Sequence, residues 1–126
     1  MKVLAIIGSP RRGETLKAVK KFEENLSSLA HVEFNYILLK DLNIKPCRGC
    51  FVCLEKGEDF CPHREDDRDK IVNAMLEADG VIFATPNYSL QVTALMKNFL
   101  DRLCYVFHRP RFFHKAFIPI VTQGVY

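Results

Sequence analysis

The hydrophobic residues of this chain fall into short apolar runs separated by longer segments of different periodicity. Residues 3–7, 81–84 and 116–121 are nearly unbroken apolar runs, a pattern typical of strands that are buried on both faces of a parallel sheet. Residues 32–38 instead alternate apolar and polar side chains. This alternation predicts a half-exposed strand at a sheet edge.

Between these strands, apolar residues recur every three or four positions, which predicts helices with one buried face. The pattern covers residues 15–29, a shorter stretch at 71–76, and residues 95–103. Asp66 and Asp67 stand just before the second of these helices, where carboxylates cap free backbone N–H groups. Strands that alternate with helices imply parallel crossovers, so we predict an α/β protein with a doubly wound parallel sheet.

The chain of 126 residues has the length of one domain. We assign residues 1–126 to that domain, with a cysteine-bearing loop at about 42–68 where no periodicity survives. Pro119 lies inside the last strand and removes a backbone donor, which is tolerated chiefly at sheet edges. The sequence stops just after this strand, so we expect a C-terminally incomplete sheet that lacks a fifth strand and the last helices.

The composition favours an ordinary globular protein over a nucleic-acid-binding or membrane-spanning one. Hydrophobic residues make up 48% and charged residues 26%, as in ordinary globular proteins. The net charge of +3 argues against a nucleic-acid partner, and no apolar run approaches the ~20 residues that a membrane span needs. The N-terminus does not resemble a secretion signal, so we expect a cytoplasmic protein with reduced thiols.

Four of the five cysteines lie close together, with the spacing Cys-x2-Cys-x2-Cys-x7-Cys. They are Cys47, Cys50, Cys53 and Cys61. Three thiolates in tandem suit the corners of an iron-sulfur cubane, with a fourth ligand from a flexible loop. Zinc is the second choice, because a zinc site usually takes two separated Cys-x2-Cys pairs, and a disulfide framework is the third. Cys104 lies on an apolar stretch, and we predict that it is a small core residue outside this group.

The loop after the first strand has the chemistry of an anion site. Residues 8–15 lead into a helix N-terminus, where free N–H groups and the helix dipole favour a phosphate. Glu14 stands where the nucleotide-binding P-loop needs a lysine, and the dinucleotide motif G-x-G-x-x-G is absent. These absences leave a terminal monophosphate as the predicted ligand.

Together these motifs resemble the flavodoxin-like, NAD(P)H-dependent FMN reductases. Residues 7–15 resemble the FMN-phosphate loop of that family, and residues 46–67 resemble the compact cysteine motif of its iron-sulfur flavoproteins. Residues 78–88 and 96–102 continue the match in the family's order. The phosphate loop departs from the common form by being one residue shorter and by carrying Glu14, and the gap from Cys53 to Cys61 is wide.

The resemblance implies a strand order of 2-1-3-4 and assigns the cofactor sites. FMN would be held by Ser9, Arg11, Arg12 and Thr15 at its phosphate, and by Thr85, Pro86, Asn87, Tyr88, Thr122, Gln123 and Gly124 along the ribityl chain and ring. A [4Fe-4S] cluster would be bound by Cys47, Cys50, Cys53 and Cys61. No side chain is expected to act as acid or base, because the cofactors carry the chemistry.

We therefore predict an FMN-dependent oxidoreductase of the iron-sulfur flavoprotein type, which passes electrons between NAD(P)H-reduced FMN and the cluster. The alternatives are a cluster-free NAD(P)H-dependent FMN or quinone reductase and, in another class, a zinc-stapled binding module without redox activity. The partner would be a small-molecule or protein electron carrier. The resemblance also implies a homodimer or homotetramer, and the basic segment 108–115 is a candidate contact for the phosphates of the nicotinamide cofactor.

Overall fold

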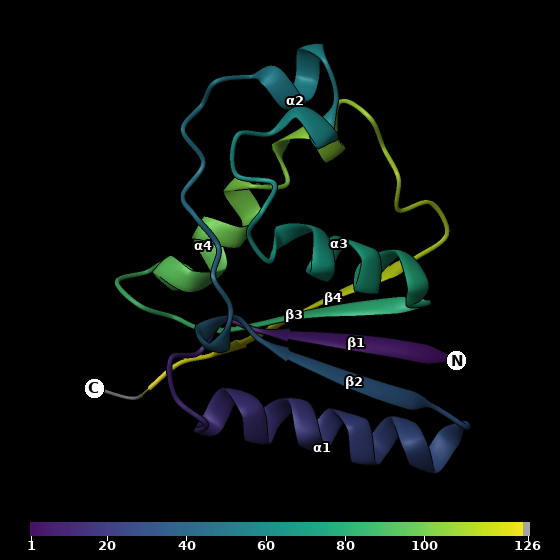
Figure 1. Cartoon of the computed structure of the whole chain (residues 1–126). Helices are drawn as coiled ribbons and strands as arrows, with labels where there is room; N and C mark the ends of the chain where they lie inside the picture. Colours follow the sequence, from purple (N-terminus) through teal and green to yellow (C-terminus); the bar gives the residue numbers. More distant parts are fainter. Residues whose placement is uncertain (125–126) are drawn as a thin grey trace.

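The computed structural model describes residues 1–124 and contains a parallel sheet with helices on both faces (Figure 1). Its strands are β1 (Lys2–Ile7), β2 (Glu33–Leu38), β3 (Gly80–Pro86) and β4 (Ala116–Thr122). They lie in the order β2-β1-β3-β4, and each neighbouring pair is parallel. The predicted doubly wound α/β sheet and its strand order are therefore confirmed.

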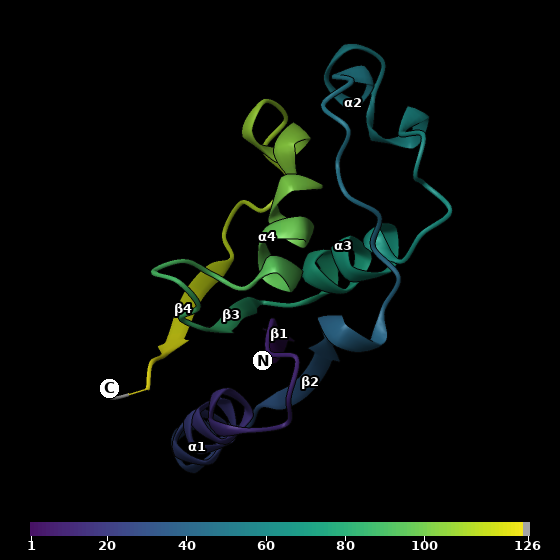
Figure 2. The ribbon, with the colours of Figure 1, turned by 90° about the vertical axis from the view of Figure 1, so that its left-hand side faces the viewer.

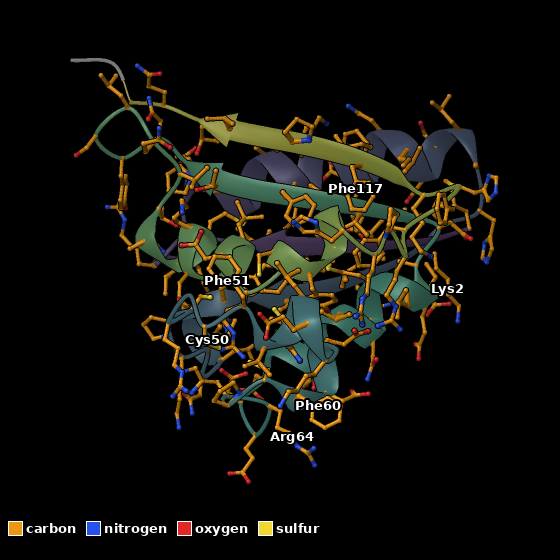
Figure 3. The ribbon with its side chains drawn as sticks, turned by 90° about the horizontal axis from the view of Figure 1, so that it is seen from above. Lys2, Cys50, Phe51, Phe60, Arg64 and Phe117 are labelled. Atoms are coloured by element: carbon orange, nitrogen blue, oxygen red, sulfur yellow. The ribbon has the colours of Figure 1, made fainter. Side chains whose placement is uncertain are left out.

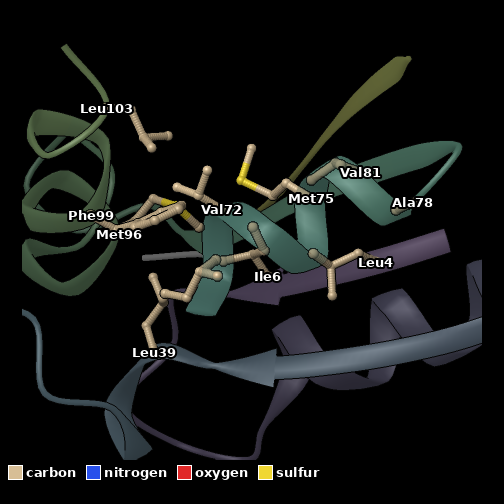
Figure 4. Close-up of a cluster of buried hydrophobic side chains, with 11 residues drawn as sticks. Leu4, Ile6, Leu39, Val72, Met75, Ala78, Val81, Met96, Phe99 and Leu103 are labelled. Carbon is tan, nitrogen blue, oxygen red and sulfur yellow. The ribbon is translucent and has the colours of Figure 1, made fainter. Parts of the chain in front are cut away.

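Helix α1 (Glu14–Leu29) covers one face of the sheet, and α3 (Arg68–Glu77) and α4 (Ala94–Asp101) cover the other (Figures 1 and 2). The central strand β1 is buried on both sides, because Val3, Ala5 and Ile7 pack toward α1 while Leu4 and Ile6 pack toward α3 and α4. Figure 4 shows the second of these cores, where β1 and β3 meet Val72, Met75, Met96 and Phe99. An unbroken apolar run thus produces a strand with two buried faces.

The cysteine segment, residues 42–67, leaves the sheet on the α3 and α4 side and projects away from it (Figure 2). It contains two short helical turns that the sequence pattern did not predict, α2 (Val52–Glu55) and η2 (Glu58–Phe60). A further turn, η1 (Leu39–Asp41), precedes it. The segment ends at Asp67, because α3 begins at Arg68.

Two helix ends differ from the prediction. Asp67 occupies the N-cap position of α3, but its carboxylate accepts the Asn43 N–H at 2.7 Å and makes no bond to the helix. Asp66 Oδ1 accepts the Arg68 N–H at 3.0 Å instead. Helix α4 ends at Asp101, earlier than its periodicity indicated, and Cys104 lies in the following turn η3 (Cys104–Phe107). These differences matter because both ends hold the cysteine segment in place.

Strand β4 is the edge of the described sheet and has a hydrogen-bonded neighbour, β3, on one side. Pro119 lies in this strand opposite Phe83 and has no backbone N–H to donate to a neighbouring strand. Phe117 is 43% exposed and stacks on Phe83, with ring centroids 5.8 Å apart. Within residues 1–124 no helix has the length and apolarity needed to cross a membrane.

Candidate functional site

Three loops at the carboxyl ends of β1, β3 and β4 line a single pocket. Its lining residues are Ser9, Arg11, Gly13, Glu14, Thr15, Pro86, Asn87, Tyr88, Thr122, Gln123 and Gly124. Every residue predicted to hold FMN is among them except Arg12 and Thr85, whereas Gly13 and Glu14 were not predicted. Ligands of open α/β sheets bind at this rim, beside the point where the strand order reverses, which here lies between β1 and β3.

Hydrogen bonds between the loops fix the shape of this pocket. The hydroxyls of Thr15 and Thr122 lie 2.7 Å apart, which joins the start of α1 to the end of β4. The Asn87 backbone N–H donates to the Thr122 carbonyl at 2.8 Å, and the Asn87 side chain donates to Gln123 Oε1 at 3.1 Å. The pocket is therefore held open by its own residues before any ligand enters.

The start of α1 supplies unpaired donors to the pocket. Gly13 is the N-cap residue and offers no side-chain acceptor, so the first N–H groups of the helix have no cap. Ser9 Oγ accepts the Arg11 N–H at 3.2 Å, which orients the loop. The carboxylate of Glu14 accepts from Lys17 Nζ at 2.7 Å, and this hydrogen bond raises the pKa of Lys17. The positive charge of Lys17 therefore offsets the negative charge of Glu14, which would otherwise repel an anionic ligand in the pocket.

The two predicted residues outside the pocket have other positions. Arg12 is exposed, and its guanidinium lies 4.0 Å from the carboxylate of Asp41. Thr85 is buried, donates to the Pro86 carbonyl at 3.0 Å and accepts the Thr93 N–H at 3.2 Å. Thr85 therefore positions the loop between β3 and α4, and its role as a contact of the ligand stays a prediction.

Gly8, at the end of β1, allows the phosphate loop and α4 to approach closely. Thr93 Oγ1 donates to the Gly8 carbonyl at 2.5 Å and accepts the Met96 N–H at 3.2 Å, so it caps α4 and ties it to the loop. A Cβ atom at Gly8 would lie only 2.8 Å from Met96 Cβ. Any larger residue at this position would separate the loop from the helix.

A second cavity, of about 320 Å³, lies between the cysteine segment and the turn after α4. All four predicted metal ligands line it, together with Cys104. Figure 3 labels Cys50 and Phe51 in this segment, below the sheet in that view. At about 30 Å³ per water molecule, the cavity has room for an inorganic group much larger than one ion.

The pKa values of two of these thiols are shifted in opposite directions. The backbone N–H of Val52 lowers the pKa of Cys50, as expected where an amide points at a thiolate. Burial, followed by the contact with Cys53, raises the pKa of Cys104 to about 11. Cys104 Sγ lies 3.6 Å from Cys53 Sγ and Cys104 is only partly buried, so its predicted place as a core residue was wrong, whereas its exclusion from the metal ligands stays a prediction.

The four predicted ligands share one cavity, and the kind of group that they bind stays a prediction. Between residues 1 and 124, no three side chains of Cys, His, Asp or Glu converge closely enough to hold one metal ion together. The cysteines instead surround a cavity from several sides. A tetrahedral zinc site requires four ligands around one point, whereas a cubane presents separate irons to separate thiolates.

The buried guanidinium of Arg102 anchors the cysteine segment. It forms an ion pair with Asp66, and both side chains are only 1% exposed. Its other donors reach the Lys45 carbonyl at 2.7 Å, the His63 carbonyl at 3.1 Å and Cys61 Sγ at 3.6 Å. Burial alone would raise the pKa of Asp66, but Arg102 and two backbone N–H groups outweigh it and lower that pKa.

The basic segment 108–115 also supports the cysteine segment. Arg111 pairs with Glu58 at 2.5 Å, and Arg109 lies 3.9 Å from the same carboxylate. Arg109 also donates to the Leu54 carbonyl at 3.0 Å. A phosphate at this segment would therefore compete with Glu58 for both arginines.

A parallel sheet in this order, with an uncapped helix start and a polar pocket at the switch point, defines the flavodoxin-like class of α/β proteins. Comparison with known proteins identifies the family. The model of the family described as NADPH-dependent FMN reductase matches residues 1–126, and the chain belongs to this family.

Individual relatives agree with this assignment. An "Iron-sulfur flavoprotein" of Archaeoglobus fulgidus is 40% identical over 126 residues, which cover 99% of this chain and 60% of the relative. A solved NADH:FMN oxidoreductase superposes with a TM-score of 0.66 at 29% identity, over 98% of this chain and 59% of its own. An azoreductase of Bacillus anthracis shares the fold, with a TM-score of 0.76 at 17% identity over 100% and 70% of the two chains. The chain spans between 49% and 60% of the length of the first curated relatives that it matches.

Proposed function

We propose that this chain carries the FMN-binding and cluster-binding portion of an NAD(P)H-dependent oxidoreductase of the iron-sulfur flavoprotein type. The observation that carries the proposal is the convergence of three loops, distant in sequence, on one polar pocket at the switch point of the sheet. Family membership supports FMN as the ligand of that pocket. The cysteine cavity, on the α3 and α4 side, supports a second redox group.

Each loop has a distinct task in holding FMN. The free N–H groups at the start of α1, with Arg11 and the hydroxyls of Ser9 and Thr15, suit the phosphate. Asn87 and Gln123, which are joined by a hydrogen bond, would supply amide groups for the ribityl chain and the polar edge of the ring. Tyr88 is 41% exposed and offers an aromatic face beside them.

When bound, FMN supplies both hydride chemistry with a nicotinamide donor and one-electron chemistry with a cluster. The chain's own residues bind and orient it. Because the cofactor carries the redox chemistry, the protein needs to supply position and electrostatic environment, and the proposal assigns no acid or base role to Glu14 and Tyr88, two ionisable residues of the lining.

The residues of the cysteine cavity fit an iron-sulfur cluster. Cys47, Cys50, Cys53 and Cys61 would be its ligands, and they are the soft donors that such clusters take. The Val52 N–H beside Cys50 is a donor of the kind that stabilises metal-bound thiolates. The relative from Archaeoglobus fulgidus is named an iron-sulfur flavoprotein, which supports this cofactor.

We also propose that the protein works as a homodimer or homotetramer that passes electrons to a small-molecule or protein carrier. The FMN pocket opens at the carboxyl ends of the strands, whereas the cysteine segment projects from the α3 and α4 side (Figures 1 and 2). Separation of the two sites within one chain favours exchange between the flavin of one copy and the cluster of another. Light scattering of the purified protein measures the oligomeric state, and a strictly monomeric, active protein contradicts this part of the proposal.

Anaerobic purification followed by visible spectroscopy, with assays of FMN, iron and acid-labile sulfide, tests the function. We expect flavin bands on a broad iron-sulfur absorption, and bleaching of the flavin by NADH or NADPH. Flavin bands without iron or sulfide indicate a cluster-free FMN reductase. A colourless protein that contains zinc and binds no FMN refutes the proposal.

A further inference from the structure

The turn that follows α4 brings two hydrogen-bond donors into contact with two of the proposed ligand sulfurs. Arg102 Nη2 lies 3.6 Å from Cys61 Sγ, and Cys104 Sγ lies 3.6 Å from Cys53 Sγ. Cys61 and Cys53 belong to the tandem cysteine motif, whereas Arg102 and Cys104 do not. The two donors come from one short segment more than 40 residues further along the chain, since Cys104 follows Cys53 by 51 positions and Arg102 follows Cys61 by 41.

The direction of both bonds follows from the chemistry of the groups. A guanidinium has donors only, so Arg102 donates to the Cys61 sulfur. A metal-bound thiolate carries no proton, so with Cys53 as a ligand the proton of the pair belongs to Cys104. The sulfurs of Cys53 and Cys104 are also too close to bind two different irons of a cubane. Their separation of 3.6 Å is that of a hydrogen bond between two sulfurs.

The donors are held rigidly. The guanidinium of Arg102 is fixed by Asp66 and by the carbonyls of Lys45 and His63, and this orientation places Nη2 beside Cys61 Sγ. Cys104 is part of η3, whose first turn also buries Tyr105. Donors that are already oriented toward a ligand sulfur interact with it without a further ordering cost.

We propose that Arg102 and Cys104 are positioning residues that raise the reduction potential of the cluster by donating hydrogen bonds to Cys61 and Cys53. The inference rests on the proposed function, because it assumes that these cysteines ligate a cluster. Hydrogen bonds to ligand sulfurs stabilise the more negative, reduced state, so their loss makes reduction harder. Asp66 balances most of the net charge of Arg102, and the directional bond to sulfur therefore carries the effect.

Potentiometric titration of the anaerobically purified protein, followed by the EPR signal of the reduced cluster, tests the proposal. The informative variants are Cys104→Ala, which removes the donor, and Cys104→Ser, which keeps one. We expect Cys104→Ala to reduce the ratio of reduced to oxidised cluster at a fixed potential by roughly three- to tenfold, given the usual strength of one hydrogen bond. A tenfold change corresponds to about 59 mV for a one-electron couple. Cys104→Ser should stay near the parent value.

Arginine variants supply a second, independent comparison. Arg102→Met should lower the potential in the same direction, whereas Arg109→Met, which removes a nearby guanidinium without sulfur contact, should not. Because Arg102 also neutralises buried Asp66, Arg102→Met weakens the segment itself, and the Cys104 variants therefore carry the decision.

The outcomes separate the inference from the function on which it rests. Unchanged potentials in Cys104→Ala overturn the inference and leave the cluster in place. Loss of iron from Cys104→Ala shows that Cys104 is a ligand, which also overturns it. A parent protein that takes up neither iron nor sulfide overturns this inference and the proposed cluster together.

Discussion

Replacement of Asp66 by asparagine should release the cysteine segment from the body of the protein. The Asp66 carboxylate accepts the Lys45 N–H at 2.9 Å and the Arg68 N–H at 3.0 Å, and it pairs with the buried guanidinium of Arg102. The asparagine side chain would keep the shape but remove the charge, which leaves Arg102 uncompensated. Breaking a buried ion pair on one side costs about 3 to 5 kcal/mol.

This loss of stability should increase local opening of the cysteine segment more than it increases unfolding of the whole protein. Neither Asp66 nor Arg102 belongs to the hydrophobic cores on the two faces of the sheet. Amide hydrogen exchange measures local opening, and we expect the Lys45 and Arg68 amides of Asp66→Asn to exchange at least about 100-fold faster, since each tenfold change corresponds to ~1.4 kcal/mol. The amides of β1 should change much less, because that strand is paired on both sides.

Asp101→Asn is the matched control. Asp101 makes an exposed pair with Lys97 on α4, and such pairs contribute about 0.3 to 0.5 kcal/mol. The pH dependence provides a second check. Because the folded pKa of Asp66 is depressed, its contribution is complete above its unfolded pKa of about 3.9 and disappears as the pH falls through the lower folded value. Equal effects of the two substitutions at neutral pH, or an Asp66→Asn effect that persists in strong acid, would refute this account.

Three further substitutions test the two cofactor sites. Arg11→Ala should weaken FMN binding by about 1 to 3 kcal/mol and leave riboflavin binding unchanged; equal weakening of both ligands, measured by flavin fluorescence, would contradict the phosphate assignment. Cys50→Ser should lose iron and acid-labile sulfide together while retaining FMN, so reduction of a one-electron acceptor should fall much more than reduction of a quinone; unchanged iron content would remove Cys50 from the ligand set. Gly8→Ala should destabilise the protein by about 1 to 3 kcal/mol in urea unfolding, because its Cβ would lie 2.8 Å from Met96 Cβ, and a neutral effect would show that α4 shifts freely.

The sheet was predictable from local patterns in the sequence, and the residues that line the pocket at its rim were expected mainly from the family resemblance. The buried run 3–7 specifies a strand, and the apolar positions of residues 15–29 specify the helix that follows it. Once the strand order is known, the ends of β1, β3 and β4 must meet at one rim. Arg12 and Thr85 are the exceptions, because Arg12 lies beside Asp41 in the distant turn η1 and Thr85 bonds to the backbone of Pro86 and Thr93. No periodicity in the sequence encodes such a contact.

The architecture of the cysteine segment was not predictable for the same physical reason. Its backbone has little regular structure of its own, and side chains from other parts of the chain hold it, among them Asn98, which donates to the Ile44 carbonyl at 2.6 Å, and Arg109. Periodicity extended α4 to residue 103, but the helix ends at Asp101, and the next residue, Arg102, directs its guanidinium into the segment. That early end carries Cys104 into the pocket beside Cys53. The one signal in the sequence for this contact was the fifth cysteine, Cys104. Its apolar neighbours predicted a position in the hydrophobic core instead.

The same buried arginine links the stability of the cysteine segment to the chemistry proposed for it. Arg102 holds the segment through Asp66, Lys45 and His63 and reaches one ligand sulfur with its remaining donor. A mobile segment would let the donor and the sulfur move independently, and the potential of the cluster would then vary among molecules. The guanidinium of Arg102 prevents this variation, because the same group that holds the backbone of the segment also makes the hydrogen bond to the ligand sulfur. Asp66→Asn should therefore broaden the redox titration of the cluster as well as open the segment, and a sharp, unshifted titration in a locally opened variant would show that the two roles are separate.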